Sequence, residues 1–202
     1  MKRYECMSIL GPKLTEEILV ITGTGNTAYQ LAEYRRPEIT PHSAQLGACS
    51  AIAFGLALAL PHRKVIALDG DGNLLFNLAV LGDIANKEPA NLGIIVFDNE
   101  NYESAGRLPT ATGNKVDLAA AAMACGFKNA STVRSLDEFE VAANRILNGH
   151  ELALLVAKVS PEPEYKRSRE LPSVPETTFT LARHIERIER LRLFSSYYST
   201  RG

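Results

Sequence analysis

The feature that most constrains the fold is a pair of polar turns, each of which follows a short apolar segment. Residues 65–69 lead into the turn 69–73, with the sequence DGDGN, and residues 92–98 lead into the turn 98–101, with the sequence DNEN. Residues 74–86 between them have the apolar spacing of a helix. This order predicts two parallel strands joined by a helix. Oxygen-rich turns at the carboxyl ends of neighbouring strands, beside a helix N-terminus, suit a Mg²⁺ ion that holds a diphosphate.

The same alternation continues along the chain. We expect further strands at 18–22, 132–133 and 151–159, a helix that ends near residue 33, and helices at 47–60, 117–125 and 135–147. Asp117 is placed to cap one helix and Gly126 to end it, and Ser135 forms a capping-box pattern with Glu138. Helix 47–60 is apolar and rich in alanine, so we expect it to be buried. The pattern predicts an α/β fold: a doubly wound parallel sheet with helices on both faces.

The flanking segments divide the chain further. We expect an N-terminal arm at 1–13, the α/β domain at 14–160, a proline-rich linker at 161–176, and a C-terminal helix and tail at 177–202. Apolar residues recur at helical spacing in the tail, at Phe179, Leu181, Ile185, Ile188 and Leu191. A tail helix after such a linker packs on its own domain or on a partner chain, and we favour an assembly contact.

Composition excludes several classes of protein. The chain has 202 residues and a net charge of −1, so no basic excess points to nucleic acid. No apolar run approaches the ~20 residues that span a bilayer, and the first residues lack the apolar core of a signal peptide. Cys6, Cys49 and Cys125 are widely spaced, which is typical of reduced thiols rather than of disulfides or zinc ligands. We therefore expect a cytoplasmic protein without a membrane partner.

The two polar turns also carry a family resemblance. Gly70-Asp71-Gly72 followed by Asp98-Asn99 resembles the Gly-Asp-Gly…Asn motif in the pyrophosphate-binding domain of thiamine diphosphate enzymes. The resemblance covers residues 13–160 and is closest to the sulfopyruvate and phosphonopyruvate decarboxylase group, in particular its beta subunit. It implies thiamine diphosphate and Mg²⁺ as cofactors and a small 2-oxoacid as substrate.

The resemblance also implies which residues bind the cofactor. The side chains of Asp71 and Asn99 and the carbonyl of Asn101 are the implied metal ligands. The other implied cofactor contacts are Thr22, Gly23, Thr24 and Asn26 in the first loop, Gln45 and Leu46, Gly70, Gly72 and Asn73, and Tyr102. In such enzymes an apolar residue wedges between the two cofactor rings, and here Leu46 takes that place. The carbonyl of Ala44 would accept a hydrogen bond from the pyrimidine amino group.

Several neighbouring residues have two open interpretations. His42 could meet the substrate or be a loop histidine, and His62 is predicted to lie on the surface. Family members often have Tyr-Gly-Ser-Thr-Gly after the metal loop, where this chain reads Tyr-Glu-Ser-Ala-Gly at 102–106. Glu103 and Ala105 therefore depart from the family pattern, which leaves the substrate and the activity open. Arg107 could pair with an anionic substrate or be solvated.

The length of the chain implies half an active site. Thiamine enzymes need a glutamate against the pyrimidine ring, and in the family it belongs to a separate domain for which this chain has no room. We expect a pyrimidine-binding partner subunit and an α₂β₂-type or larger hetero-oligomer, with a homodimer as the alternative. The leading hypothesis is a subunit of a 2-oxoacid decarboxylase whose product is an aldehyde or a ligation product. Alternatives are a non-catalytic cofactor-binding subunit, a subunit of a 2-oxoacid oxidoreductase or split transketolase, and, last, a nucleotide-binding module.

Overall fold

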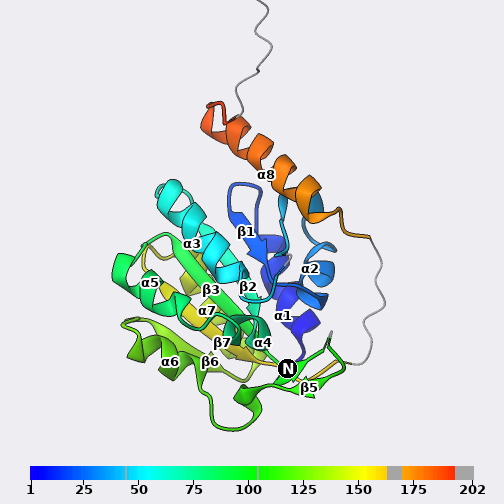
Figure 1. The fold of residues 1–202 in the computed structure, drawn as a ribbon, viewed down its shortest axis with the longest axis vertical. Coiled ribbons are helices and arrows are strands. Elements are labelled where there is room, and N and C mark those ends of the chain that lie inside the picture. The colour runs from blue at the N-terminus through cyan, green and yellow to red at the C-terminus, as the bar shows by residue number, and fades with distance from the viewer. Residues whose placement is uncertain (44, 104, 163–169, 194–202) are drawn as a thin grey trace, which may run out of the picture.

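The computed structural model describes residues 1–43, 45–103, 105–162 and 170–193. Its centre is a five-stranded parallel sheet (Figure 1). In spatial order the strands are β1 (Leu19–Thr22), β2 (Val65–Gly70), β3 (Leu92–Asp98), β7 (Ala153–Lys158) and β6 (Ala130–Val133). Every pairing within this sheet is parallel. The α/β class predicted from the sequence is confirmed.

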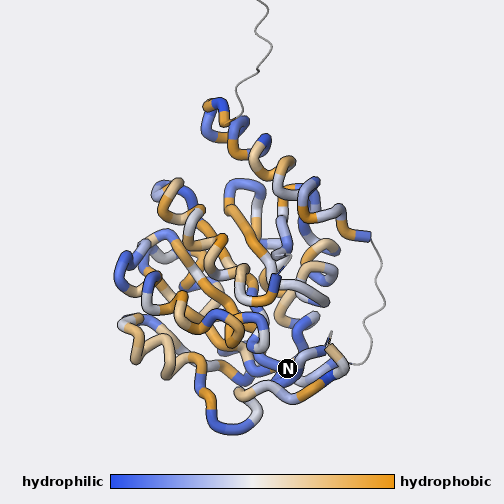
Figure 2. Tube along the Cα trace, in the orientation of Figure 1, coloured by the Kyte–Doolittle hydropathy of each residue, from blue (hydrophilic) through white to orange (hydrophobic). Residues whose placement is uncertain are grey.

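Helices cover both faces of the sheet. One face packs against α3 (Cys49–Ala59), α5 (Val80–Lys87), α6 (Leu118–Ala124) and α8 (Val174–Glu189). The other packs against α1 (Arg3–Leu10), α2 (Asn26–Leu31) and α7 (Leu136–Asn148). Successive side chains of a strand point to opposite faces, so Val65 and Ala67 join the first core and Ile66 and Leu68 the second. The apolar strands lie inside the more polar helices in Figure 2.

The predicted helix boundary signals are confirmed. The Asp117 carboxylate accepts hydrogen bonds from the backbone N–H groups of Ala119 and Ala120 at 2.9 and 3.0 Å. Ser135 and Glu138 form the reciprocal capping box at the start of α7. These caps satisfy backbone donors that the first turn of a helix leaves without a partner.

The first residues are not the arm that the sequence predicts. They form α1 and a 3₁₀ turn (Gly11–Lys13), and Cys6, Met7 and Leu10 are fully buried in the second core. The spacing of these three residues places them on one side of a short helix. The helix has only eight residues and begins with polar ones, so its apolar pattern in the sequence is too short to distinguish a packed helix from an unpacked arm.

Two internal segments also differ from expectation. The helix predicted at 74–86 is broken into α4 (Asp71–Leu75) and α5. After the second polar turn the chain forms a small antiparallel hairpin, β4 (Asn101–Tyr102) with β5 (Leu108–Pro109), and a 3₁₀ turn (Ala111–Gly113); another 3₁₀ turn is Pro37–Ile39. Helix α3 is not fully buried, because Ile52 and Leu58 are 43% and 47% exposed.

The C-terminal helix begins earlier than predicted and packs on its own domain. Ser173 caps it, and Pro175 lies in the first turn, where a missing N–H group breaks no helical hydrogen bond. Leu181 and Ile185 are buried in the first core, while Phe179 is exposed. An assembly contact through the outer side of α8 stays a prediction. Part of the predicted linker, residues 163–169, and the tail from residue 194 lie outside the described residues.

None of the helices in the described ranges combines the length and the apolar character that crossing a membrane requires.

Candidate active site

A cavity of about 410 Å³ opens at the carboxyl ends of β1, β2 and β3. Ligands of open parallel sheets bind at this edge. Ten of the residues implicated from the sequence line it: Thr24, Asn26, Leu46, Gly70, Asp71, Gly72, Asn73, Asn99, Asn101 and Tyr102. The fold therefore brings the first loop, the Leu46 turn and both polar turns to one place.

Other implicated residues lie outside the lining. Thr22 ends β1, and its buried Oγ1 has no hydrogen-bond partner among the described residues. Gly23 is buried behind the lining and donates its N–H to the Leu68 carbonyl at 2.8 Å. Gln45 is exposed and does not line the cavity. Ala44, the predicted acceptor for the pyrimidine amino group, lies outside the described residues.

Asp71 is the acidic group at the base of the cavity. It begins α4 directly after β2, is only 2% exposed, and accepts a hydrogen bond at Oδ2 from Thr110 at 2.5 Å, with the Thr112 hydroxyl oxygen 3.2 Å from the same atom. Burial, and next the charge of nearby Asp98, raises the pKa of the Asp71 carboxyl. A carboxylate held in this way is costly without a counterion, so the site favours a bound cation.

Asp98 stands behind Asp71 and is already neutralised. Its carboxylate pairs with Lys158 at 2.9 Å and accepts a hydrogen bond from Thr112 at 2.8 Å. Thr112 thus bridges the two carboxylates. Asp98 therefore has a cation of its own, whereas no ion pair involves the buried carboxylates of Asp69 and Asp71 among the described residues. Asp69 accepts hydrogen bonds from Ser50 and Asn73 and does not line the cavity, so Asp71 is the carboxylate of the two that a bound cation could reach.

The donors next to Asp71 fit a hard cation. The Oδ1 atom of Asn101 is buried and has no hydrogen-bond partner in the described part of the chain. Asn99 is 4% exposed and lines the same cavity, where its Oδ1 accepts from the Asn101 N–H at 3.0 Å. Carboxylate, amide and carbonyl oxygens are the ligands that Mg²⁺ prefers. The described residues contain no group of three or more His, Cys, Asp and Glu side chains able to hold a metal, which a softer metal would need.

Two glycines bring the backbone close to the cavity floor. A Cβ atom at Gly72 would overlap the ring of Tyr102, and Gly25, which precedes α2, has φ +94°. Only glycine adopts that backbone conformation without strain. Tyr102 also contacts Phe76 edge-to-face, with ring centroids 6.0 Å apart. Glycine therefore lets the Tyr102 ring pack directly on the backbone at Gly72 and lets the chain turn into α2 at Gly25.

Hydrogen bonds fix the segment with Leu46 to the turn 69–73. The Asn73 Oδ1 accepts from the Gly47 N–H at 2.8 Å, and its Nδ2 donates to Asp69. Ser50 on α3 donates to the same buried carboxylate at 2.7 Å. Leu46 is held at the cavity wall with its side chain 42% exposed. Both polar atoms of the Asn73 amide bind protein groups. Its contact with a diphosphate stays a prediction.

Sequence reasoning missed a charged cluster at the cavity rim. Arg3 from α1, Glu103 from the hairpin and Glu162 from the segment after β7 meet there and line the cavity; we call these three residues the rim cluster. Arg3 donates to Glu103 at 2.8 Å and approaches Glu162 at 3.6 Å. The sequence pointed to this cluster only through Glu103, which stands where the family pattern has a glycine. The sequence also gave no reason to select Thr110, Thr112 or the lining residue Phe97.

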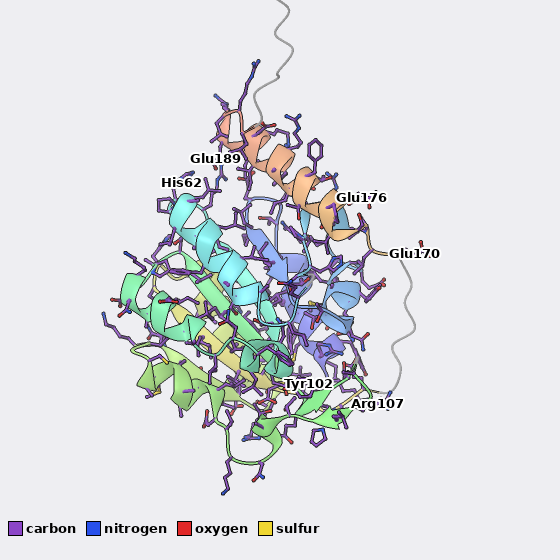
Figure 3. The ribbon with its side chains drawn as sticks, viewed as in Figure 1. His62, Tyr102, Arg107, Glu170, Glu176 and Glu189 are labelled. Atoms are coloured by element: carbon purple, nitrogen blue, oxygen red, sulfur yellow. The ribbon has the colours of Figure 1, made fainter. Side chains whose placement is uncertain are left out.

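The three uncertain residues fall in different places. His42 is half-buried beside β1 and does not line the cavity, and burial lowers the pKa of its imidazole. His62 is exposed as predicted and hydrogen-bonds Glu189 of α8 at 2.7 Å, far from the hairpin that carries Tyr102 and Arg107 (Figure 3). Arg107 lines the cavity at its exposed edge.

Comparison with known proteins defines the class. Residues 22–157 match the sequence profile described as "Thiamine pyrophosphate enzyme, C-terminal TPP binding domain". The fold is also similar to benzoylformate decarboxylase from Polynucleobacter necessarius, with a TM-score of 0.70 and 21% identity over 81% of this chain and 34% of that one. This chain belongs to the thiamine pyrophosphate enzyme family, as its C-terminal TPP-binding domain.

Comparison with individual proteins is more specific than the family match. The chain is 31% identical to sulfopyruvate decarboxylase subunit beta of Methanocaldococcus jannaschii, over 86% of this chain and 92% of that subunit. It is 33% identical to sulfopyruvate decarboxylase of Methanosarcina acetivorans, over 87% of this chain and 45% of that protein. Phosphonopyruvate decarboxylase of Streptomyces hygroscopicus is 30% identical over 86% of this chain and 46% of its own length. The chain thus spans nearly all of a beta subunit but under half of these two relatives.

Proposed function

We propose that this chain is the thiamine diphosphate- and Mg²⁺-binding subunit of a two-chain 2-oxoacid decarboxylase-type lyase. The observation that carries the proposal is the buried cavity end where Asp71, Asn99 and Asn101 gather from two neighbouring strand ends. The extent of the match supports the division into two chains, because this chain covers a named beta subunit almost completely.

The chain's own residues would hold the cofactor by its diphosphate end. Asp71, Asn99 and the Asn101 carbonyl would bind the Mg²⁺, while the loop with Thr24 and Asn26 would bind phosphate oxygens. When bound, thiamine diphosphate supplies the electron sink that allows a 2-oxoacid to lose CO₂. Leu46 would support the cofactor from below. Protein groups that are already fixed in the free protein lose less conformational freedom when a ligand binds. The hydrogen bonds around Asn73 fix this part of the cavity in advance.

A partner subunit would supply the carboxylate for the pyrimidine ring. The carboxylates that line the cavity within the described residues are Asp71, Glu103 and Glu162. The first is assigned to the metal, and the other two surround Arg3. A glutamate from a second polypeptide, a pyrimidine-binding subunit in an α₂β₂-type or larger assembly, would complete the site.

Exposed apolar side chains on α3 and around the cavity support such an assembly. Ile52, Leu58 and the glycine between them, Gly55, are exposed on α3. Leu46 and Phe76, at and near the cavity, are 42% and 61% exposed. Neighbouring exposed apolar side chains of this size mark contacts between proteins. We further propose that the assembly works in the cytoplasm, in keeping with three free thiols.

A non-catalytic cofactor-binding subunit is the second candidate. It rests on the replacement of the family's glycine by Glu103, whose side chain reaches into the rim of the cavity and pairs with Arg3. This change would leave cofactor binding intact while altering the space in which a substrate reacts.

The test is purification of the tagged chain from its native host with Mg²⁺ and thiamine diphosphate, followed by mass spectrometry and a CO₂-release assay with a panel of 2-oxoacids. A stoichiometric second chain with a pyrimidine-binding domain, and CO₂ release that Asp71→Asn abolishes, support the proposal. Cofactor binding in the assembly without CO₂ release from any 2-oxoacid favours the non-catalytic subunit. Recovery of the chain alone, with neither cofactor nor activity, contradicts both.

A further inference from the structure

The rim cluster joins four parts of the chain through one carboxylate. Glu103 Oε2 accepts hydrogen bonds from Arg3 at 2.8 Å and from the Asn26 amide at 3.2 Å. Its Oε1 accepts from the backbone N–H of Glu162 at 3.3 Å. Asn99 lies near enough to help lower the pKa of this carboxyl group. The amides of Asn26 and Asn99 both line the cavity.

An asparagine amide has one donor end and one acceptor end, so a fixed acceptor on one side sets its orientation. The Oδ1 atom of Asn99 accepts from the Asn101 N–H in the turn 98–101 at 3.0 Å, so its Nδ2 is the end of the amide left to face the Glu103 carboxylate. The same argument orients Asn26 in the first loop. A carboxylate that orients both amides therefore fixes polar groups on two sides of the proposed diphosphate site.

The carboxylate is itself held rigidly. Arg3 is 5% exposed, and its Nε donates to Gln30 at 3.1 Å, which in turn donates to Glu162 at 2.6 Å. Glu162 also accepts from the Tyr4 backbone N–H at 3.2 Å. Figure 1 shows the N-terminus beside the hairpin that carries Glu103. The cluster thus connects α1 to the cavity, and its groups have several partners each.

We propose that Glu103, anchored by Arg3, is a positioning residue that orients the amides of Asn99 and Asn26 toward the metal and diphosphate of the cofactor, an inference that rests on the proposed function. Glu103 is not one of the proposed metal ligands. It acts through the two amides, as outer hydrogen-bond partners do around metal ligands generally, where their loss weakens metal binding by about 10- to 100-fold.

The experiment measures Mg²⁺-dependent binding of thiamine diphosphate, and Mn²⁺ binding by electron paramagnetic resonance, in the full chain with its co-purified partner. Glu103→Gln keeps the size of the side chain but removes one acceptor oxygen and the charge. We expect it to weaken the metal affinity by about tenfold or more. Glu162→Gln is the matched control, because it removes the other carboxylate that pairs with Arg3, and Glu162 contacts neither amide. We expect this variant to change the metal affinity by less than about twofold.

The outcomes separate the two proposals. Equal metal affinity in wild type and Glu103→Gln, or equal losses in Glu103→Gln and Glu162→Gln, would overturn the positioning role while the cofactor site stands. Failure of the wild-type assembly to bind cofactor and metal overturns the proposed function instead. If Glu103→Gln does not fold, Arg3→Lys is measured in the same way, because lysine lacks the second donor that holds Gln30. Unchanged affinity in that variant also overturns the inference.

Discussion

The two ends of the cavity satisfy their polar groups in different ways. At the metal end, defined by Asp71, Asn99 and Asn101, a carboxylate with a raised pKa lies near an amide oxygen that has no partner in the described structure. At the rim, every member of the charged cluster has partners from the protein itself. Among the described residues, the metal end thus keeps a polar group without a protein partner, whereas the groups of the rim cluster are paired with one another. Under the two proposals, the first end would bind the metal and the second would position its ligands.

The largest expected effect is at the metal end. Asp71→Asn removes the anionic ligand, and we expect CO₂ release by the assembly to fall at least about a hundredfold, with loss of bound Mg²⁺. The metal content of the purified assembly and its rate of CO₂ release check this. Circular dichroism serves as the fold control. A variant that keeps its Mg²⁺ would place the metal elsewhere.

The next effect is at the wall between the two ends. Leu46→Ala removes an apolar side chain from the cavity without touching a charged group, so we expect cofactor binding to persist while the rate falls about tenfold. Since Leu46 is 42% exposed, the free energy of unfolding should change by less than about 1 kcal/mol. Rates are compared at equal cofactor occupancy. A loss confined to cofactor affinity would make Leu46 part of the binding surface alone.

The cavity floor should be intolerant of a single methyl group. Gly72→Ala forces a Cβ atom into the Tyr102 ring, and we expect a loss of about 1–3 kcal/mol in the free energy of unfolding. Gly82→Ala on α5 is the matched control, because a Cβ atom there meets no atom within 4 Å. Denaturant unfolding of both variants measures the difference. Equal stability of the two variants would mean that Tyr102 does not close against the floor.

The smallest effect, a contrast in the pH dependence of stability, compares the two ends directly. In metal-free protein, burial raises the pKa of Asp71, so its folded form binds more protons and stability is lost as pH rises through that pKa. For Glu103, burial raises the pKa, but Arg3 and the hydrogen bonds outweigh burial and lower it. Its contribution is present above the unfolded pKa and is lost as pH falls through the lowered pKa.

Near neutral pH, with chelator present, Asp71→Asn should therefore be more stable than wild type. Glu103→Gln should be less stable, by about 1 kcal/mol. Both differences should shrink toward acid pH. Urea unfolding of both variants across this range tests the contrast, and two differences of the same sign at neutral pH would remove it.

The sequence could predict the metal end because its signals are local. The turns 69–73 and 98–101 each follow an apolar strand, and neighbouring parallel strands bring their ends together. The caps at Asp117 and Ser135 are local in the same sense. The rim cluster could not be predicted, because Arg3, Glu103 and Glu162 are distant in the chain and meet only through packing. The burial of α1 was missed for the same reason, since its apolar face is defined by its contact with α7 and the sheet.

The most direct test of the account is the dissociation constant of thiamine diphosphate from the assembled protein, measured in Mg²⁺ and in excess chelator, for wild type and Asp71→Asn. The account predicts saturable binding by wild type that needs Mg²⁺, and binding by Asp71→Asn that Mg²⁺ no longer improves. Equally tight binding with chelator, or equal Mg²⁺ dependence in both proteins, would contradict the assignment of the metal to Asp71.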